Sequence, residues 1–169
     1  MRRLLGIDLG ERRIGLAIAD GDGSPARPLQ TVRRARTPEA DARRLAAIVT
    51  AHDAQELVVG LPLEAAGQSG TQAEYTRQWV AAISPLVGLP VSFRDERLTS
   101  HLAEQRLGPM KRGRSGGPPT PAQREAYRAR VDREAAAIIL QDELDARAAA
   151  DTGAAGDAVA NGDHTEASR

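Results

Sequence analysis

The sequence RLLGIDLG (residues 3–10) is an apolar run that carries one carboxylate, Asp8, in its middle. A short apolar run of this kind predicts a buried strand. Burial of an unpaired carboxylate costs on the order of several kcal/mol, so Asp8 needs a neutralising partner, and a metal ion is a common one. The next run, RRIGLAIAD (residues 12–20), predicts a second strand. Asp8 is therefore expected in a β-hairpin with strands over about residues 3–9 and 12–19.

The rest of the chain predicts an alternation of strands and helices. A third short strand around residues 30–32 would complete a three-stranded meander, and further strands are expected over 56–62 and 90–94. Helices are expected after Thr37, around the apolar stripe from Tyr75 to Leu86, after Thr99, and from Thr120 to about Arg147. The order β-β-β-α-β-α-β-α-α predicts an α/β fold with a mixed five-stranded sheet and helices on both faces.

The length of 169 residues suits one domain, expected over residues 1–147, followed by a tail over 148–169. The tail is acidic, with Asp151, Asp157, Asp163 and Glu166 opposed by Arg169 alone. It shows no apolar periodicity and is rich in Ala, Gly and Asp. We therefore expect it to be disordered.

The composition excludes several classes of protein. Cysteine is absent, so there are no disulfides and no thiolate metal ligands, and any metal must be held by oxygen or imidazole. No stretch has transmembrane length, and Asp8 interrupts the first apolar run too early for a signal peptide. We therefore expect a cytoplasmic protein with no membrane partner.

Three separated acidic positions could supply oxygen ligands. Asp8 lies in the first strand, and Asp95-Glu96 ends a late strand, where open α/β sheets place their ligands. Asp132 flanks the apolar stripe of the last helix. Carboxylates without Cys or suitably spaced His indicate Mg²⁺ or Mn²⁺. Two such ions about 3.5–4 Å apart can activate a water and stabilise the leaving oxygen of a phosphodiester.

Each acid also has an ordinary structural interpretation. Asp95 could cap the next helix or pair with Arg97. Glu96 could form an exposed salt bridge, and Asp132 could pair with a neighbouring arginine such as Arg128. Taken singly, none of these acids identifies a metal site.

Residues 106–133 form a strongly basic segment, with eight Lys or Arg residues against two acids. A local excess of this size suits a phosphate-rich partner, although a solvated charged face is the plain alternative. The candidates for binding nucleic acid are Lys111, Arg112, Arg114, Arg124, Arg128 and Arg130.

Four motifs resemble the YqgF (RuvX) family: GIDLG with RIGLA (residues 6–17), VVGLP (58–62), DERLT (95–99), and VD before AAAIIL (131–140). The resemblance covers about residues 3–147. It implies a ribonuclease H-like fold and a nuclease that matures the 5′ end of precursor 16S ribosomal RNA. The family is also named for Holliday junction resolution. The resemblance implies that Asp8, Glu96 and Asp132 are the catalytic, metal-binding acids.

The resemblance does not decide which further residues support the three acids or complete the metal coordination. The candidates for supporting roles are Asp20, Asp95, Arg13, Arg97 and Thr99. Junction resolvases of this fold often carry a fourth ligand one helical turn after the third, but Ala135 and Ala136 occupy those positions here. Asp20 or solvent would then complete the coordination, although the turn-forming sequence DGDGS (20–24) explains Asp20 equally simply.

Three classes of function follow from these observations. A metal-dependent nuclease with a two-metal mechanism is favoured, and family analogy favours structured RNA over branched DNA. An actin-like ATPase shares the GIDLG motif but closes two domains around its nucleotide, whereas this chain has room for one. A non-catalytic nucleic-acid-binding module would need only the basic segment. A homodimer would suit a symmetric four-way junction.

Overall fold

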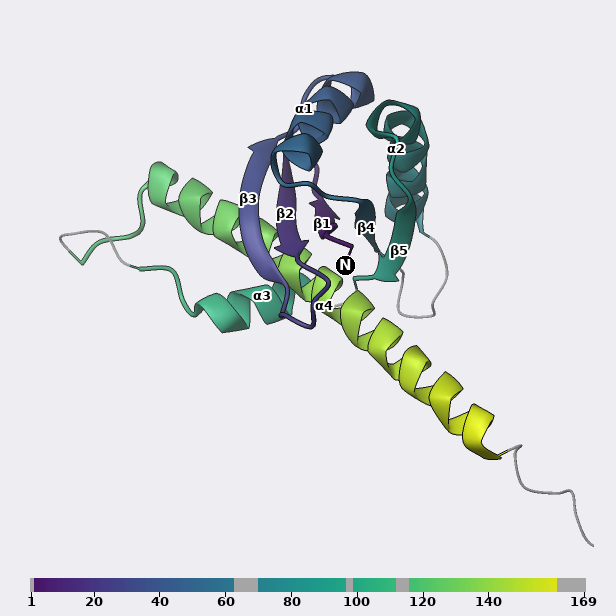
Figure 1. Ribbon diagram of the computed structural model, residues 1–169. Helices are drawn as coiled ribbons and strands as arrows, with labels where there is room; N and C mark the ends of the chain where they lie inside the picture. The colour runs from purple at the N-terminus through teal and green to yellow at the C-terminus, as the bar shows by residue number, and fades with distance from the viewer. Residues whose placement is uncertain (1, 63–69, 97–98, 112–115, 161–169) are drawn as a thin grey trace, which may run out of the picture.

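The computed structural model describes residues 2–62, 70–96, 99–111 and 116–160. Its centre is a five-stranded sheet with the strand order β3-β2-β1-β4-β5 (Figure 1). The strands are β1 (Leu4–Leu9), β2 (Arg13–Ala19), β3 (Arg27–Arg33), β4 (Glu56–Leu61) and β5 (Val91–Asp95). β1 and β3 each pair antiparallel with β2, whereas β4 pairs parallel with both β1 and β5. The mixed sheet predicted from the sequence is confirmed.

Helices cover both faces of this sheet, as predicted (Figure 1). They are α1 (Pro38–Ala51), α2 (Thr71–Val87), α3 (Thr99–Leu107) and α4 (Pro121–Ala160). α1 and α2 pack on one face, against large side chains such as Leu5, Ile7 and Leu57. α4 packs on the other face, and α3 packs against α4. The β-β-β-α-β-α-β-α-α order and the α/β fold class are therefore confirmed.

Small residues on the second face let α4 approach the strands closely. Gly6 and Gly15 lie on this face of β1 and β2. A Cβ added to Gly6 would lie 2.8 Å from the carbonyl oxygen of Ala136, and one added to Gly15 would collide with the carbonyl oxygen of Asp132. The backbone of α4 thus lies directly on the sheet, which fixes where its side chains stand relative to β1 and β2.

α4 is longer than the sequence predicted. Its start is as expected: the Thr120 hydroxyl accepts a hydrogen bond from the Gln123 N–H, and the Gln123 side chain accepts one from the Thr120 N–H. The helix continues past Arg147 to Ala160, so the prediction of disorder from residue 148 is wrong for 148–160. That stretch is rich in alanine, whose intrinsic helix propensity is high enough to extend a helix without an apolar face. The domain boundary at residue 147 stays a prediction.

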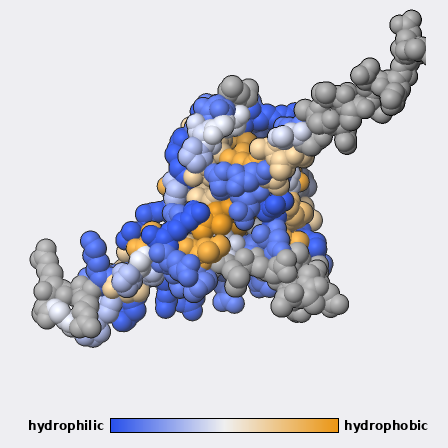
Figure 2. Space-filling view, turned by 90° about the horizontal axis from the view of Figure 1, so that it is seen from below, coloured by the Kyte–Doolittle hydropathy of each residue, from blue (hydrophilic) through white to orange (hydrophobic). Residues whose placement is uncertain are grey.

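The face of the molecule seen from below is mostly polar (Figure 2). In the view from below, hydrophilic residues cover most of the periphery and hydrophobic ones show through in the middle (Figure 2). Among the described residues, the large apolar side chains that are exposed are Tyr75, Leu86, Phe93 and Leu102, which come from α2, β5 and α3. Scattered exposed apolar residues are normal in folded proteins. None of the described helices combines the length and the apolarity needed to cross a membrane.

Candidate metal centre

Asp8 and Glu96 meet at the carboxyl ends of β1 and β5. Asp8 pairs with Gly15 in the β1–β2 ladder, and strand alternation places it on the α4 face of the sheet. Glu96 directly follows β5, and its backbone N–H donates a 3.2 Å hydrogen bond to the carbonyl of Leu61 at the end of β4. A Cβ added to Gly60 of β4 would collide with the Glu96 carboxylate. Gly60 therefore leaves the space between β1 and β5 that Glu96 occupies.

The two carboxyl groups share a hydrogen bond, and both favour the protonated form. Burial raises the pKa of Asp8 well above its usual value, and the charges of Glu96 and Asp132 raise it further. Burial also raises the pKa of Glu96 to about 7, an effect that the hydrogen bond with Asp8 opposes and the charge of Asp95 reinforces. Without a cation, the pair therefore retains a proton near neutral pH.

Asp132 reaches the same region from α4, but an arginine holds it. Arg13 Nε donates a 2.5 Å hydrogen bond to Asp132 Oδ2, and Arg13 Nη1 donates to the Glu125 carboxylate at 3.1 and 3.2 Å. In the part of the chain that the structure describes, no three acidic, histidine or cysteine side chains lie close enough together to hold a metal ion. The arrangement is thus a carboxyl pair, Asp8 and Glu96, with a third acid nearby that Arg13 neutralises.

The raised pKa of Glu96 predicts that the metal-free protein loses stability as the pH rises. Its folded pKa of about 7 exceeds its ordinary value of 4.5, so this contribution is fully present below pH 4.5 and is lost as the pH rises through 7. The unfolding temperature in EDTA should therefore fall between about pH 5 and pH 8. Glu96→Gln should make this fall smaller and leave the part that the raised pKa of Asp8 contributes, as measured by scanning calorimetry.

Asp20→Asn is the matched control for that series, because hydrogen bonding by Arg27 lowers the pKa of Asp20. Its stability should keep the wild-type pH dependence above pH 5. A Glu96→Gln protein with the same slope as wild type would show that Glu96 is ionised at neutral pH in the folded state.

Thr99 and Asp95 flank Glu96 in different ways. Thr99 is the first residue of α3, and its hydroxyl donates a 2.6 Å hydrogen bond to the carbonyl oxygen of Glu96, which also accepts the Thr99 N–H at 3.0 Å. Thr99 therefore holds the backbone that carries the Glu96 side chain. Asp95 ends β5 and adds a charge beside Glu96. Direct ligation by Asp95 stays a prediction.

Asp20, which the sequence offered as a further ligand, lies at the other end of the sheet. It follows β2, whose end pairs with the start of β1 at Leu4, whereas Asp8 lies near the end of β1. Its carboxylate is held by Arg3 at 2.7 Å and by Arg27 at 2.8 Å. The prediction that Asp20 supports the site is wrong, because an antiparallel hairpin places the end of its second strand beside the start of its first.

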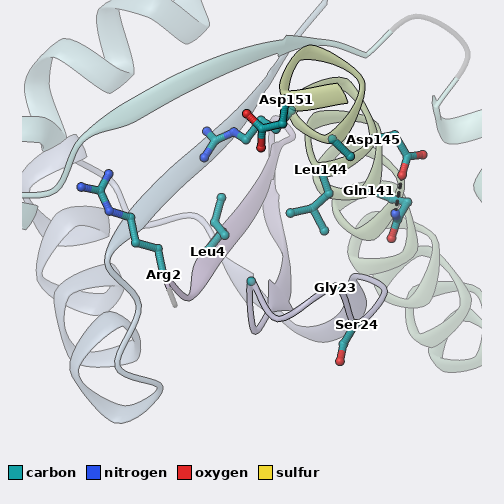
Figure 3. Close-up of a pocket in the computed structure, with 11 residues that line it drawn as sticks. Arg2, Leu4, Gly23, Ser24, Gln141, Leu144, Asp145 and Asp151 are labelled. Carbon is teal, nitrogen blue, oxygen red and sulfur yellow. Dashed lines mark hydrogen bonds between the residues drawn. The ribbon is translucent and has the colours of Figure 1, made fainter. Parts of the chain in front are cut away.

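A hollow of about 450 Å³ also lies at that far end (Figure 3). Its lining comes from the start of the chain, the β2–β3 connection and α4, and includes Leu4, Ser24 and Leu144. Leu4 is the first residue of β1, whereas Asp8 lies near the end of the same strand. This hollow is therefore separate from the carboxyl pair, and its lining contains none of the predicted site residues.

The predicted basic residues lie in and before the first half of α4. Arg128 lines a hollow of about 440 Å³ together with Arg13 and Asp132, so it stands beside the candidate site. Lys111, Arg124 and Arg130 are exposed. Arg97, Arg112 and Arg114 lie outside the described residues.

Two arginines near the carboxylates were not predicted from the sequence. Arg12 lines the hollow beside Asp132, and Arg33 lines the next hollow along the surface. Both belong to arginine doublets, at 12–13 where β2 begins and at 33–34 where β3 ends. Because β2 and β3 are antiparallel neighbours, the two doublets meet at one end of the sheet. The doublets were the signal that could have indicated a basic surface there.

Residues 2–146 match the family RuvX, described as Holliday junction resolvase. The chain belongs to the RuvX family. The membership expected from the four sequence motifs is thus confirmed.

RuvX relatives match the chain over nearly their whole length. One from Anaeromyxobacter sp. (strain Fw109-5), named "Putative pre-16S rRNA nuclease", is 46% identical over 145 residues, which are 86% of this chain and 98% of the relative. One from Roseiflexus sp. (strain RS-1) with the same name is 40% identical over 146 residues, or 86% and 95% of the two chains. Among solved structures, RuvC of T. thermophilus in complex with a Holliday junction is similar, at 16% identity and a TM-score of 0.46, over 87% of this chain and 96% of that one.

Proposed function

We propose that this protein is a metal-dependent nuclease that hydrolyses phosphodiester bonds in the 5′-end maturation of precursor 16S ribosomal RNA. The observation that carries the proposal is the buried, proton-sharing pair Asp8 and Glu96, with Asp132 near it on α4. The names of the relatives support ribosomal RNA as the substrate. The family description supports a Holliday junction resolvase as the second candidate.

The donor set fits Mg²⁺ or Mn²⁺. Carboxylate oxygens are the hard ligands that these ions prefer, and a cation at Asp8 and Glu96 would replace the proton that the pair otherwise retains. Asp132 would be the third ligand, once Arg13 has released it. Asp8, Glu96 and Asp132 would hold the ions, which in a two-metal arrangement would supply an activated water and stabilisation of the leaving oxygen of the phosphodiester.

Side chains of the chain itself would bind and orient the scissile phosphate. Arg128 lies in the same hollow as Asp132 and can contact a phosphate oxygen there. Arg13 would keep its contact with Glu125 after releasing Asp132, so its guanidinium would stay at the edge of the site. Thr99 fixes the backbone of Glu96 and thereby limits the positions of its carboxylate. Such positioning brings the reacting groups together before the chemical step.

A comparison of two substrates tests the proposed function. With Mn²⁺ or Mg²⁺, we expect cleavage of a precursor 16S ribosomal RNA fragment that carries the 5′ leader, no cleavage of a synthetic four-way DNA junction, and no activity in EDTA. Symmetric nicking of the junction would instead make the resolvase the primary function, and it would call for the homodimer expected from the sequence. Binding of RNA without cleavage under any metal would leave a non-catalytic binding module.

The cytoplasmic location also stays a prediction.

A further inference from the structure

Two neighbouring hollows run along the turn between β1 and β2. The first is lined by Gly10, Glu11, Arg12, Arg13, Arg128 and Asp132. The second is lined by Glu11, Arg12, Arg33, Arg34, Ala35 and Glu125. Each has a volume of about 440 Å³. They share Glu11 and Arg12 in their linings and are therefore adjacent. Together they are called here the arginine groove, with Asp132 in the first hollow and Arg33, at the end of β3, in the second.

The arginine groove carries cations that nothing in the described chain neutralises. Its lining has five arginines against three acids, a formal excess of +2. Arg13 forms ion pairs with Asp132 and Glu125. Among the described residues, the guanidinium groups of Arg12, Arg33 and Arg128 have no hydrogen-bond or ion-pair partner. All three residues are exposed.

The turn that presents Arg12 is held in place by its neighbour Arg34. The Gly10 N–H donates a 2.9 Å hydrogen bond across the turn to the carbonyl of Arg13. The Arg34 N–H donates to the carbonyl of Arg12 at 2.9 Å, and Arg34 Nη1 donates to the carbonyl of Gly10 at 3.0 Å. Both ends of the turn are therefore tied to the end of β3, where Arg33 stands.

Arg34 is itself fixed by a buried network. Its Nε donates a 2.8 Å hydrogen bond to Asp41 of α1, which is 1% exposed. Asp41 also accepts a 3.1 Å hydrogen bond from Trp79 Nε1. The Arg34 guanidinium lies 5.7 Å from the ring centroids of both Trp79 and Tyr75, within range of a cation–π contact. The groove is thus supported from beneath, and little ordering of its backbone remains to be done when a ligand binds.

We propose that the arginine groove binds the phosphodiester backbone of the substrate strand as it leaves the carboxylates, with Arg12 and Arg33 as its phosphate contacts. The proposal rests on the nuclease function proposed above and adds the path of the strand. Along this path, Arg128 contacts the strand beside Asp132, in the first hollow. Arg12, which lines both hollows, contacts it next. Arg33, in the second hollow, contacts it farthest from the reacting bond. Guanidinium contacts to phosphate position a strand without reading its sequence. Arg12 and Arg33 therefore contribute affinity, and the basic segment 106–133 is not the whole binding surface.

The test measures binding apart from cleavage. A fluorescein-labelled single-stranded RNA from the precursor 5′ leader is titrated with wild type, Arg12→Ala, Arg33→Ala and the double variant in EDTA, over roughly 50 to 200 mM salt. Arg27→Ala is the matched control, because Arg27 is an exposed arginine on the same strand as Arg33 but pairs with Asp20 at the far end. Each groove variant should weaken binding about 3- to 10-fold and reduce the salt slope by about 0.7, whereas Arg27→Ala should match wild type.

A second readout separates this proposal from the proposed function. In the cleavage assay, the double variant should raise KM and leave kcat near wild type, because its contacts lie away from the reacting bond. Binding and salt slope unchanged in the double variant would overturn the groove, even if wild type cleaves. Wild type that binds RNA through the groove but cleaves nothing would overturn the nuclease function and leave the groove standing. Unfolding temperatures close to that of wild type would show that the exposed substitutions leave the fold intact.

Discussion

Asp8→Asn should abolish metal-dependent cleavage and leave the protein folded. The substitution keeps the shape of the side chain but removes the carboxyl group that shares a hydrogen bond with Glu96. The loss of rate should be at least about 10³-fold, or roughly 4 kcal/mol of activation free energy. The asparagine amide can donate to Glu96 the hydrogen bond that the shared proton makes in wild type. The unfolding temperature should therefore be no lower than that of wild type at neutral pH.

Asp20→Asn is the matched control for this variant. It makes the same chemical change at the opposite end of the hairpin, where Arg3 and Arg27 hold the carboxylate. It should cleave at close to the wild-type rate. Both variants are compared in single-turnover assays on the precursor RNA with Mn²⁺. Cleavage by Asp8→Asn within a few-fold of wild type would remove Asp8 from the catalytic centre.

Gly15→Ala is expected to reduce both stability and activity. The added methyl group would collide with the carbonyl oxygen of Asp132, a backbone atom that cannot rotate away as a side chain would. α4 would have to shift off β2, at a cost of roughly 3 kcal/mol in the free energy of unfolding. The same shift would move Asp132 relative to Asp8. Urea denaturation measures the first effect, and residual cleavage by the folded fraction measures the second.

Gly117→Ala provides the corresponding control, because nothing lies within 4 Å of the position that its Cβ would take. Its free energy of unfolding should stay within about 0.5 kcal/mol of wild type. If Gly15→Ala denatured at the wild-type urea concentration, the close contact between α4 and β2 would not hold in solution.

The order of the elements and the place of Asp8 could be predicted because both depend on local patterns. Continuous apolar runs mark the strands buried on both faces, and capping residues mark the start of α4. The position of Glu96 at the end of β5 could also be predicted from the sequence, because open α/β sheets place their ligand-binding residues at the carboxyl ends of the strands.

The partners of the site residues could not be predicted in the same way. The contact between Arg13 and Asp132 depends on how α4 crosses the sheet, and no spacing in the sequence encodes it. Asp20 is close to Asp8 in sequence but not in the fold. In the antiparallel hairpin, the end of β2 that precedes Asp20 pairs with the start of β1, whereas Asp8 lies near the end of β1. The sequence beyond Arg147 does not predict a helix by periodicity, because apolar periodicity is absent there and the high helix propensity of alanine alone favours the helix.

The close fit of α4 on the sheet has a consequence for the order in which activity can arise. Arg13 and Asp132 lie 119 residues apart, and α4 is the last element that the structure describes. During synthesis, every described strand therefore leaves the ribosome before Asp132 does. A nascent chain could complete the hydrogen bonds of its sheet and still lack the third acid. If the protein cuts ribosomal precursors, it would acquire that ability only after α4 has been synthesised and has docked on the sheet.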